Sequence, residues 1–205
     1  MREALAVPTL KLPKDVVLQT ALGLLRAGDR PLTPSEIADG IWWVDVQLWG
    51  SRAYGLTLER WTLSEQGVDL PSLAPLRQGH LPAGWDPWVT QEKGQLTPSV
   101  ESRGWALDDL SRRVGEYIAT AATSGPARWA VDRDNWSRQA AEKAQETPLA
   151  VEAMLELTRH PQKDWPHLAE HYAEQLAMAH AFQPYPSAPS PPVDARERAR
   201  VRRRR

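Results

Sequence analysis

Apolar residues recur at helical spacing in the stretch that follows Thr33. Four of them stand four, three and four residues apart, namely Ile37, Ile41, Val44 and Leu48. This spacing predicts a helix with one side buried. Thr33 and Glu36 can form a capping box, and Pro34 suits the first helical position. The sequence therefore marks the start of this helix clearly.

Three tryptophans widen the apolar surface of the same predicted helix: Trp42, Trp43 and Trp49. Each indole can remove roughly 150–250 Å² from water, so we expect this helix at the centre of the core. Asp45 lies beside the apolar stripe. If it is buried, it needs a backbone amide or a basic group as partner. The alternative is a carboxylate at the edge of the stripe that faces water.

Similar patterns predict the other elements. Helices are expected over residues 15–27, 107–122, 132–145 and 147–158 and from 164 to about 182, with a helical turn or two over 70–76. Alternating residues predict a strand over 58–63, and residues 88–90 and 95–97 can pair as a hairpin. The predicted fold class is mainly α, a compact helical domain with a small two- or three-stranded β element.

Composition changes sharply towards the carboxyl end. A proline-rich stretch follows Phe182, and residues 194–205 hold seven arginines against Asp194 and Glu197, a net +5. The whole chain carries −1, so residues 1–193 carry −6. These patterns predict a helical domain over 1–145, a helical pair over 146–183 and a disordered basic tail over 184–205. The tail is a candidate for binding nucleic acid or an acidic partner.

The sequence offers little for catalysis. It lacks cysteine, a glycine-rich phosphate loop and the G-x-S-x-G pattern of hydrolases. His167 and His171 have a spacing that can hold a metal, although surface histidines are the commoner case. We therefore expect a protein without enzymatic activity, metal or cofactor. No apolar run has the length of a membrane span, and a cytoplasmic location without membrane contact is expected.

Several short motifs occur in a recognisable order. They are Ile41-Trp42-Trp43-Val44-Asp45, Tyr54-Gly55-Leu56-Thr57, Trp61, Gly67 with Pro71, Leu107 with Ser111, and Asp134-Asn135-Trp136. This order resembles the Panacea domain, the antitoxin domain also found in SocA-like proteolytic adaptors, over about residues 14–145. Two positions depart from the family pattern. Val68 stands where the family has proline after glycine, and Asp132 or Arg133 replaces its histidine upstream of the tryptophan.

The resemblance implies an antitoxin that neutralises a cognate protein toxin by direct binding, in some cases as a proteolytic adaptor. Asp45, Gly55, Gly67 and Trp136 would be the structural motif residues. The proposed contact residues are Trp85, Trp88, Tyr54 and Trp61. Trp85 and Trp88 are chosen because exposed aromatic residues in loops make good interface anchors. The choice assumes that the 85–88 loop is exposed. The alternative is that Trp85 and Trp88 fill the core.

Two other functions remain open on the sequence. The first two predicted helices, joined by a short turn, could begin a winged-helix DNA-binding regulator. The chain could also be a phage or mobile-element accessory protein.

Overall fold

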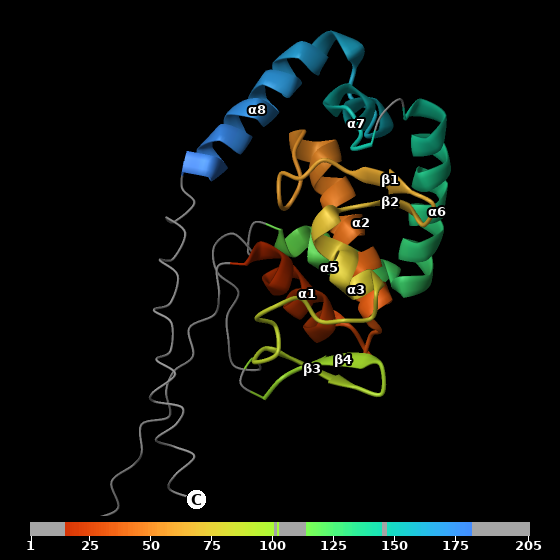
Figure 1. Cartoon of the computed structure of the whole chain (residues 1–205), viewed down its shortest axis with the longest axis vertical. Coiled ribbons are helices and arrows are strands. Elements are labelled where there is room, and N and C mark those ends of the chain that lie inside the picture. Colours follow the sequence, from red (N-terminus) through yellow and green to blue (C-terminus); the bar gives the residue numbers. More distant parts are fainter. Residues whose placement is uncertain (1–14, 101, 103–113, 145–146, 182–205) are drawn as a thin grey trace, which may run out of the picture. The chain divides into compact units, whose positions relative to one another are not determined.

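The computed structural model describes residues 15–100, 102, 114–144 and 147–181, and this part is mainly helical (Figure 1). The longer helices are α1 (Val16–Ala27), α2 (Pro34–Arg52), α5 (Gly115–Ser124), α6 (Pro126–Lys143), α7 (Val151–Leu157) and α8 (Trp165–Ala181). The shorter helical elements are η1 (Pro71–Leu73), α3 (Ala74–Arg77) and η2 (Gln162–Asp164). The predicted mainly α fold class is confirmed. The predicted basic tail lies outside the described residues.

The chain divides into two compact units, Met1–Tyr172 and Ala173–Arg205. The described part of the second unit is the end of α8, residues 173–181. The core and the clusters of side chains around Asp45, Tyr54 and Asp39 lie within the first unit. The predicted domain limits, after residues 145 and 183, adjoin positions outside the described part and remain predictions.

Helix α2 begins as the sequence predicts. The Thr33 hydroxyl accepts the Glu36 amide at 3.2 Å, and the Glu36 carboxylate accepts the Thr33 amide at 2.8 Å. Thr33 itself is extended, with ψ of 159°, and Pro34 takes the first helical position. Such a cap contributes roughly 1 kcal/mol to stability.

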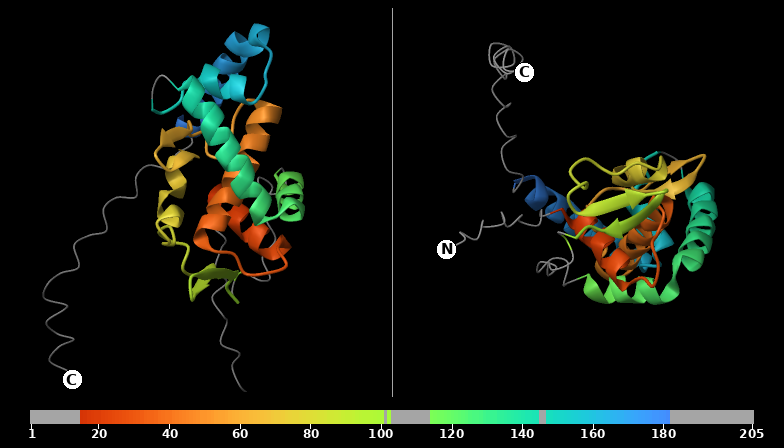
Figure 2. Two further views of the ribbon diagram at one scale, coloured as in Figure 1. Left: turned by 90° about the vertical axis from the view of Figure 1, so that its right-hand side faces the viewer. Right: turned by 90° about the horizontal axis from the view of Figure 1, so that it is seen from below.

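Burial of α2 goes further than a single stripe. Ile37, Ile41, Trp42, Val44 and Trp49 have no exposed surface. Other elements contact α2 along its length, namely α1, α3, α5, α6 and α7. Figure 1 and Figure 2 show α2 inside this arrangement, with α6 running beside it. The predicted stripe is buried and α2 lies at the centre of the core, as expected. Burial extends beyond the stripe because neighbours cover α2 on several sides.

Two antiparallel hairpins complete the described fold. Strands β3 (Val89–Glu92) and β4 (Gln95–Pro98) pair around a turn at Lys93 and Gly94, as predicted. Strands β1 (Thr62–Ser64) and β2 (Gly67–Asp69) form a second hairpin. The strand predicted over 58–63 thus begins later, because Leu58 has a left-handed backbone with φ of 60°.

Two helices begin elsewhere than predicted. Helix α6 starts at Pro126, six residues before the predicted start, because Gly125 ends α5 with φ of 77° and a proline follows. Helix α7 starts at Val151 rather than Thr147, because the Leu149 amide donates to the Trp61 carbonyl oxygen at 2.8 Å and Ala150 is extended. The predicted 107–122 helix is described from Val114 onward, and α5 occupies its last part.

Within the described residues, no helix combines the length and apolar character needed to cross a bilayer.

Candidate functional site

Asp45 lies in the core and holds the turn that follows α2. Its Oδ1 accepts the Leu56 amide at 2.6 Å, and its Oδ2 accepts the Trp61 indole N–H at 2.8 Å. The side chain is completely buried. The prediction of a backbone amide partner is confirmed, and the alternative of a water-facing carboxylate is wrong.

Burial shifts the acidity of this group. Desolvation raises the pKa of Asp45 from 3.8 to about 7, against the opposing effects of the Trp61 and Leu56 hydrogen bonds. The negative charges of Glu59 and Asp69 add to the rise. Both bonded donors are neutral N–H groups, so no opposite charge in these bonds offsets the loss of water.

Gly55 allows the turn to approach Asp45 closely. A Cβ at position 55 would lie 2.0 Å from Asp45 Oδ1 and 2.7 Å from its Oδ2. Neither distance is compatible with a side chain. Glycine is therefore required here for space, and the Tyr54-Gly55-Leu56 motif and Asp45 form one packed unit.

Aromatic rings join this unit to α6. Trp61 lies 6.2 Å from Trp42 and 5.6 Å from Trp136, measured between ring centroids. Trp42 and Trp136 lie 6.1 Å apart with nearly perpendicular planes. Trp49 and Tyr172 extend the cluster, because Trp49 contacts Trp61 at 6.1 Å and Tyr172 at 5.3 Å. Such pairs contribute about 0.5–1.5 kcal/mol each beyond their buried area.

The motif residues are therefore brought together in part. Asp45, Gly55, Trp61 and Trp136 meet in one cluster built from α2, the following turn and α6. Gly67 belongs to a different contact. It has φ of 103°, a Cβ there would lie 2.5 Å from Ser137 Oγ, and that hydroxyl accepts the Val68 amide at 2.9 Å. Gly67 thus allows the β1–β2 hairpin to pack closely against Ser137 of α6.

Three of the four proposed contact residues are not on the surface. Trp61 has no exposed area, and Trp85 and Trp88 are each 2% exposed. The Trp85 indole N–H points to Asp15 Oδ2 at 3.4 Å, and the Trp85 carbonyl oxygen accepts the amides of Trp88 and Val89. The 85–88 loop folds its indoles inward, so the premise that they are exposed anchors was wrong.

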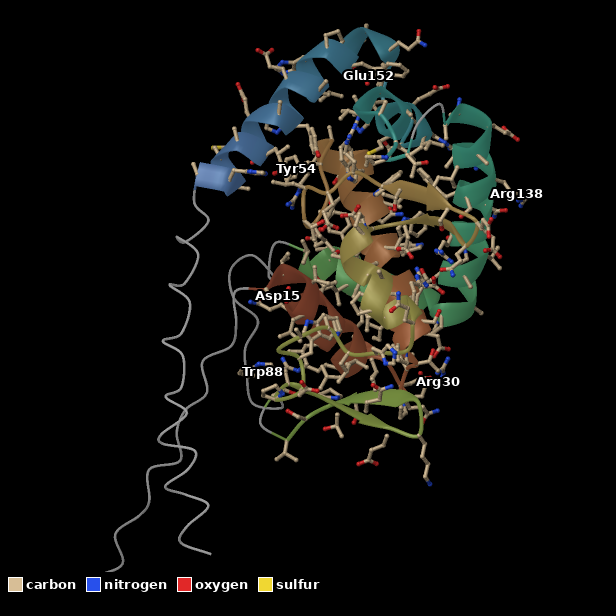
Figure 3. All side chains as sticks on the ribbon, viewed as in Figure 1. Asp15, Arg30, Tyr54, Trp88, Arg138 and Glu152 are labelled. Carbon is tan, nitrogen blue, oxygen red and sulfur yellow. The ribbon has the colours of Figure 1, made fainter. Side chains whose placement is uncertain are left out.

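Tyr54, labelled in Figure 3, is half-exposed. Its ring is 5.6 Å from the His171 ring of α8. Two positions before Tyr54, at the end of α2, the Arg52 guanidinium lies 6.0 Å from the Tyr117 ring, and the Tyr117 hydroxyl donates to Ser51 Oγ at 2.9 Å. We call Arg52, Tyr54, Tyr117 and His171 the Tyr54 surface.

A buried ionic network was missed by the sequence reasoning. Arg77 of α3 pairs with Asp39 of α2 at 2.5 Å and also with Asp69 of β2. Arg133 of α6 lies 3.8 Å from Asp39 and 3.5 Å from Asp69, and its guanidinium donates to the Gln66 carbonyl oxygen at 2.8 Å. The partners lie far apart in the chain, and no spacing rule pairs them.

The predicted histidine pair does not form a site with other ligands. Among the described residues, no group of three or more histidine, cysteine, aspartate or glutamate side chains could hold a metal ion. His171 instead faces Tyr54, and His160 Nε2 lies 2.8 Å from the Trp49 carbonyl oxygen.

Comparison with known proteins gave no match to any family model, curated protein or solved structure.

Proposed function

We propose that this chain is a binding protein of the Panacea antitoxin or SocA-like adaptor type, which neutralises a cognate protein toxin by direct contact. The observation that carries the proposal is the convergence of Asp45, Gly55, Trp61 and Trp136. These residues belong to motifs that are spread over about ninety positions of the sequence. The resemblance to the Panacea domain is based on these motifs. Their contacts provide a physical reason for these motifs to occur together in one chain.

The Tyr54 surface is the contact face that we propose for the partner. Tyrosine and arginine are common among the residues that dominate binding energy at interfaces. The surface is also well supported, because Asp45 holds the Leu56 amide and the Tyr172 hydroxyl donates to the Leu58 carbonyl oxygen at 2.6 Å. A rigid support lowers the entropic cost of binding.

The arrangement of α2 favours protein contact over DNA binding. In a winged-helix regulator the helix after the turn enters the major groove. Here the corresponding helix is α2, and its residues from Ile37 to Val46 are buried. Saturable, sequence-dependent binding to a DNA duplex would contradict the proposal and support the regulator instead.

Co-purification tests the proposed function. The full chain is expressed with the product of the neighbouring gene, and the complex is isolated through a tag on either protein. We expect a stable complex, with a growth defect caused by the neighbour alone and removed by this chain. A neighbour that is harmless alone, or toxic but not bound and not neutralised, would overturn the antitoxin proposal.

A further inference from the structure

A cavity opens where α2, α6 and α7 come together. It has a volume of about 290 Å³, and its lining includes Val46, Gln47, Trp136, Gln139, Leu157 and Arg159. The three helices contact one another pairwise in the fold (Figure 1). Val46 and Leu157 are buried, whereas Gln139 and Arg159 are exposed. The cavity therefore has an apolar floor and a polar rim.

Four polar side chains of this cavity have no partner inside the described fold, whereas the Thr158 hydroxyl, which also lines it, donates to the Met154 carbonyl oxygen at 2.8 Å. Gln47, Gln139 and Arg159 make no side-chain hydrogen bond or ion pair within the described part of the chain, and the same holds for the Trp136 indole N–H. The described residues that line the cavity include no carboxylate. The cavity thus offers N–H donors that no described protein group occupies, two amide acceptors and one positive charge.

These groups match a planar ligand that carries an anion. A carboxamide can pair with both a donor and an acceptor on the edge of a nucleobase, as glutamine does with adenine. An indole wall suits an aromatic ring, and a guanidinium binds phosphate through parallel N–H groups. Arg159 lies at the exposed rim, where a charged group can keep part of its hydration.

We propose that this cavity binds a nucleoside monophosphate. The base lies on the apolar floor beside Trp136, with its edge towards the glutamine amides above the floor, and the phosphate pairs with Arg159 at the rim. The volume is close to the lower end of the usual range for ligand cavities, which favours a single nucleotide over a larger cofactor. The site is separate from the Tyr54 surface, and the proposal does not depend on the antitoxin function.

Gly50 provides a sharp test because it lines the cavity and a Cβ there clashes with nothing. A Cβ at position 50 has no other atom within 4 Å. Gly50→Met should therefore fill the cavity while leaving the fold intact. Its melting temperature should equal or exceed that of the wild type, because glycine is a poor residue inside a helix.

Calorimetric titration of the full chain with adenosine and guanosine monophosphates measures binding. We expect one molar equivalent of at least one nucleotide to bind, and Gly50→Met to abolish this binding. Arg159→Gln should weaken it by about tenfold or more, and so should removal of the phosphate by using the nucleoside. Arg138→Gln is the matched control, because Arg138 is bonded to Asn135 on α6 and does not line the cavity.

Two results would overturn the proposal. The first is that neither nucleotide binds the wild-type chain. The second is binding that Gly50→Met leaves unchanged, or that Arg138→Gln weakens as much as Arg159→Gln. That second result would place the nucleotide elsewhere, with the arginines of residues 194–205 as the alternative source of positive charge.

Discussion

At the scale of single residues, the contact between Asp45 and Gly55 sets the geometry of the chain after α2. Gly55 is not in a left-handed conformation. Glycine is needed at this position because a side chain would overlap the Asp45 carboxylate. Gly50, five residues earlier, faces open space. The two glycines therefore make a matched pair for mutation.

We expect Gly55→Ala to lower the free energy of unfolding by about 3 kcal/mol, because the new methyl group overlaps Asp45. Gly50→Ala should raise it by up to about 1 kcal/mol, because alanine favours the helix. Urea unfolding followed by circular dichroism measures both. Equal effects of the two substitutions would show that Gly55 is not packed against Asp45.

The raised pKa of Asp45 predicts a pH dependence of stability. Between pH 3.8 and about 7 the folded chain keeps a proton on Asp45 that the unfolded chain releases. The contribution of this group to the free energy of unfolding is therefore largest below about pH 4, and it is lost as the pH rises to about 7. The total change is about 4 kcal/mol at most. In the Asp45→Asn variant this pH-dependent contribution to the free energy of unfolding should disappear.

Unfolding free energies of the wild type and Asp45→Asn, measured from pH 4 to pH 8, give the test. The difference between the two proteins should change over this range and level off above pH 7. A difference independent of pH would mean that the folded pKa of Asp45 is close to that of the unfolded chain.

At the scale of elements, the predictable parts are those with local signals. The α2 cap and the α1 cap, in which Asp15 accepts the Val17 and Leu18 amides, depend on neighbouring residues. The β3–β4 turn has its signal at Glu92-Lys93-Gly94. Strand β2 was missed because it is three residues long and is held by β1 and by Ser137 of α6.

The ionic network ties four elements together, and its loss should be costly. Arg77→Gln leaves the carboxylates of Asp39 and Asp69, whose side chains are only 12% and 15% exposed, without their closest positive charge. We expect a loss of about 3–5 kcal/mol at pH 7. The loss should shrink at pH 5, because burial raises the pKa of Asp39 and protonation then removes its charge more readily.

Arg30→Gln is the control for this prediction. Arg30, labelled in Figure 3, pairs with Glu36 at 2.6 Å. Its side chain is 48% exposed, so water screens the pair and the cost should be much smaller than that of Arg77→Gln. Chemical unfolding at pH 5 and pH 7 compares the two variants. A similarly small loss for Arg77→Gln would contradict a stabilising role for the network.

At the scale of the whole molecule, sequence reasoning found the central helix but misjudged the surface. The part of the Asp45 cluster between Trp42 and Trp61 was recognised because these residues are close in sequence and rich in tryptophan, whereas Trp136, some ninety positions away, was included through the family resemblance. For Trp85 and Trp88 the sequence left exposure and burial in the core as alternatives, and the second is confirmed. The choice depends on contacts such as that of Trp85 with Asp15, seventy positions away. A loop sequence does not indicate which way its side chains point.

The basic segment at the carboxyl end gives a prediction for the complete chain. Its composition cannot form a core, so deletion of residues 184–205 should shift the melting temperature by less than about 2 °C. Differential scanning calorimetry of both chains measures this. A large decrease would mean that this segment contributes to folding. If the segment binds RNA, deletion should also remove the salt-dependent part of the affinity.

Growth rescue tests the central claim, which is partner binding through the Tyr54 surface. The double variant Arg52→Glu/Tyr117→Ala changes that surface and leaves the Asp45 cluster intact. Arg138→Glu is the control, because it makes the same arginine-to-glutamate change at an exposed position of α6. With all proteins folded and equally expressed, we predict that cells producing the neighbouring toxin survive with the wild type and Arg138→Glu, but not with the double variant. Full rescue by the double variant would contradict the claim.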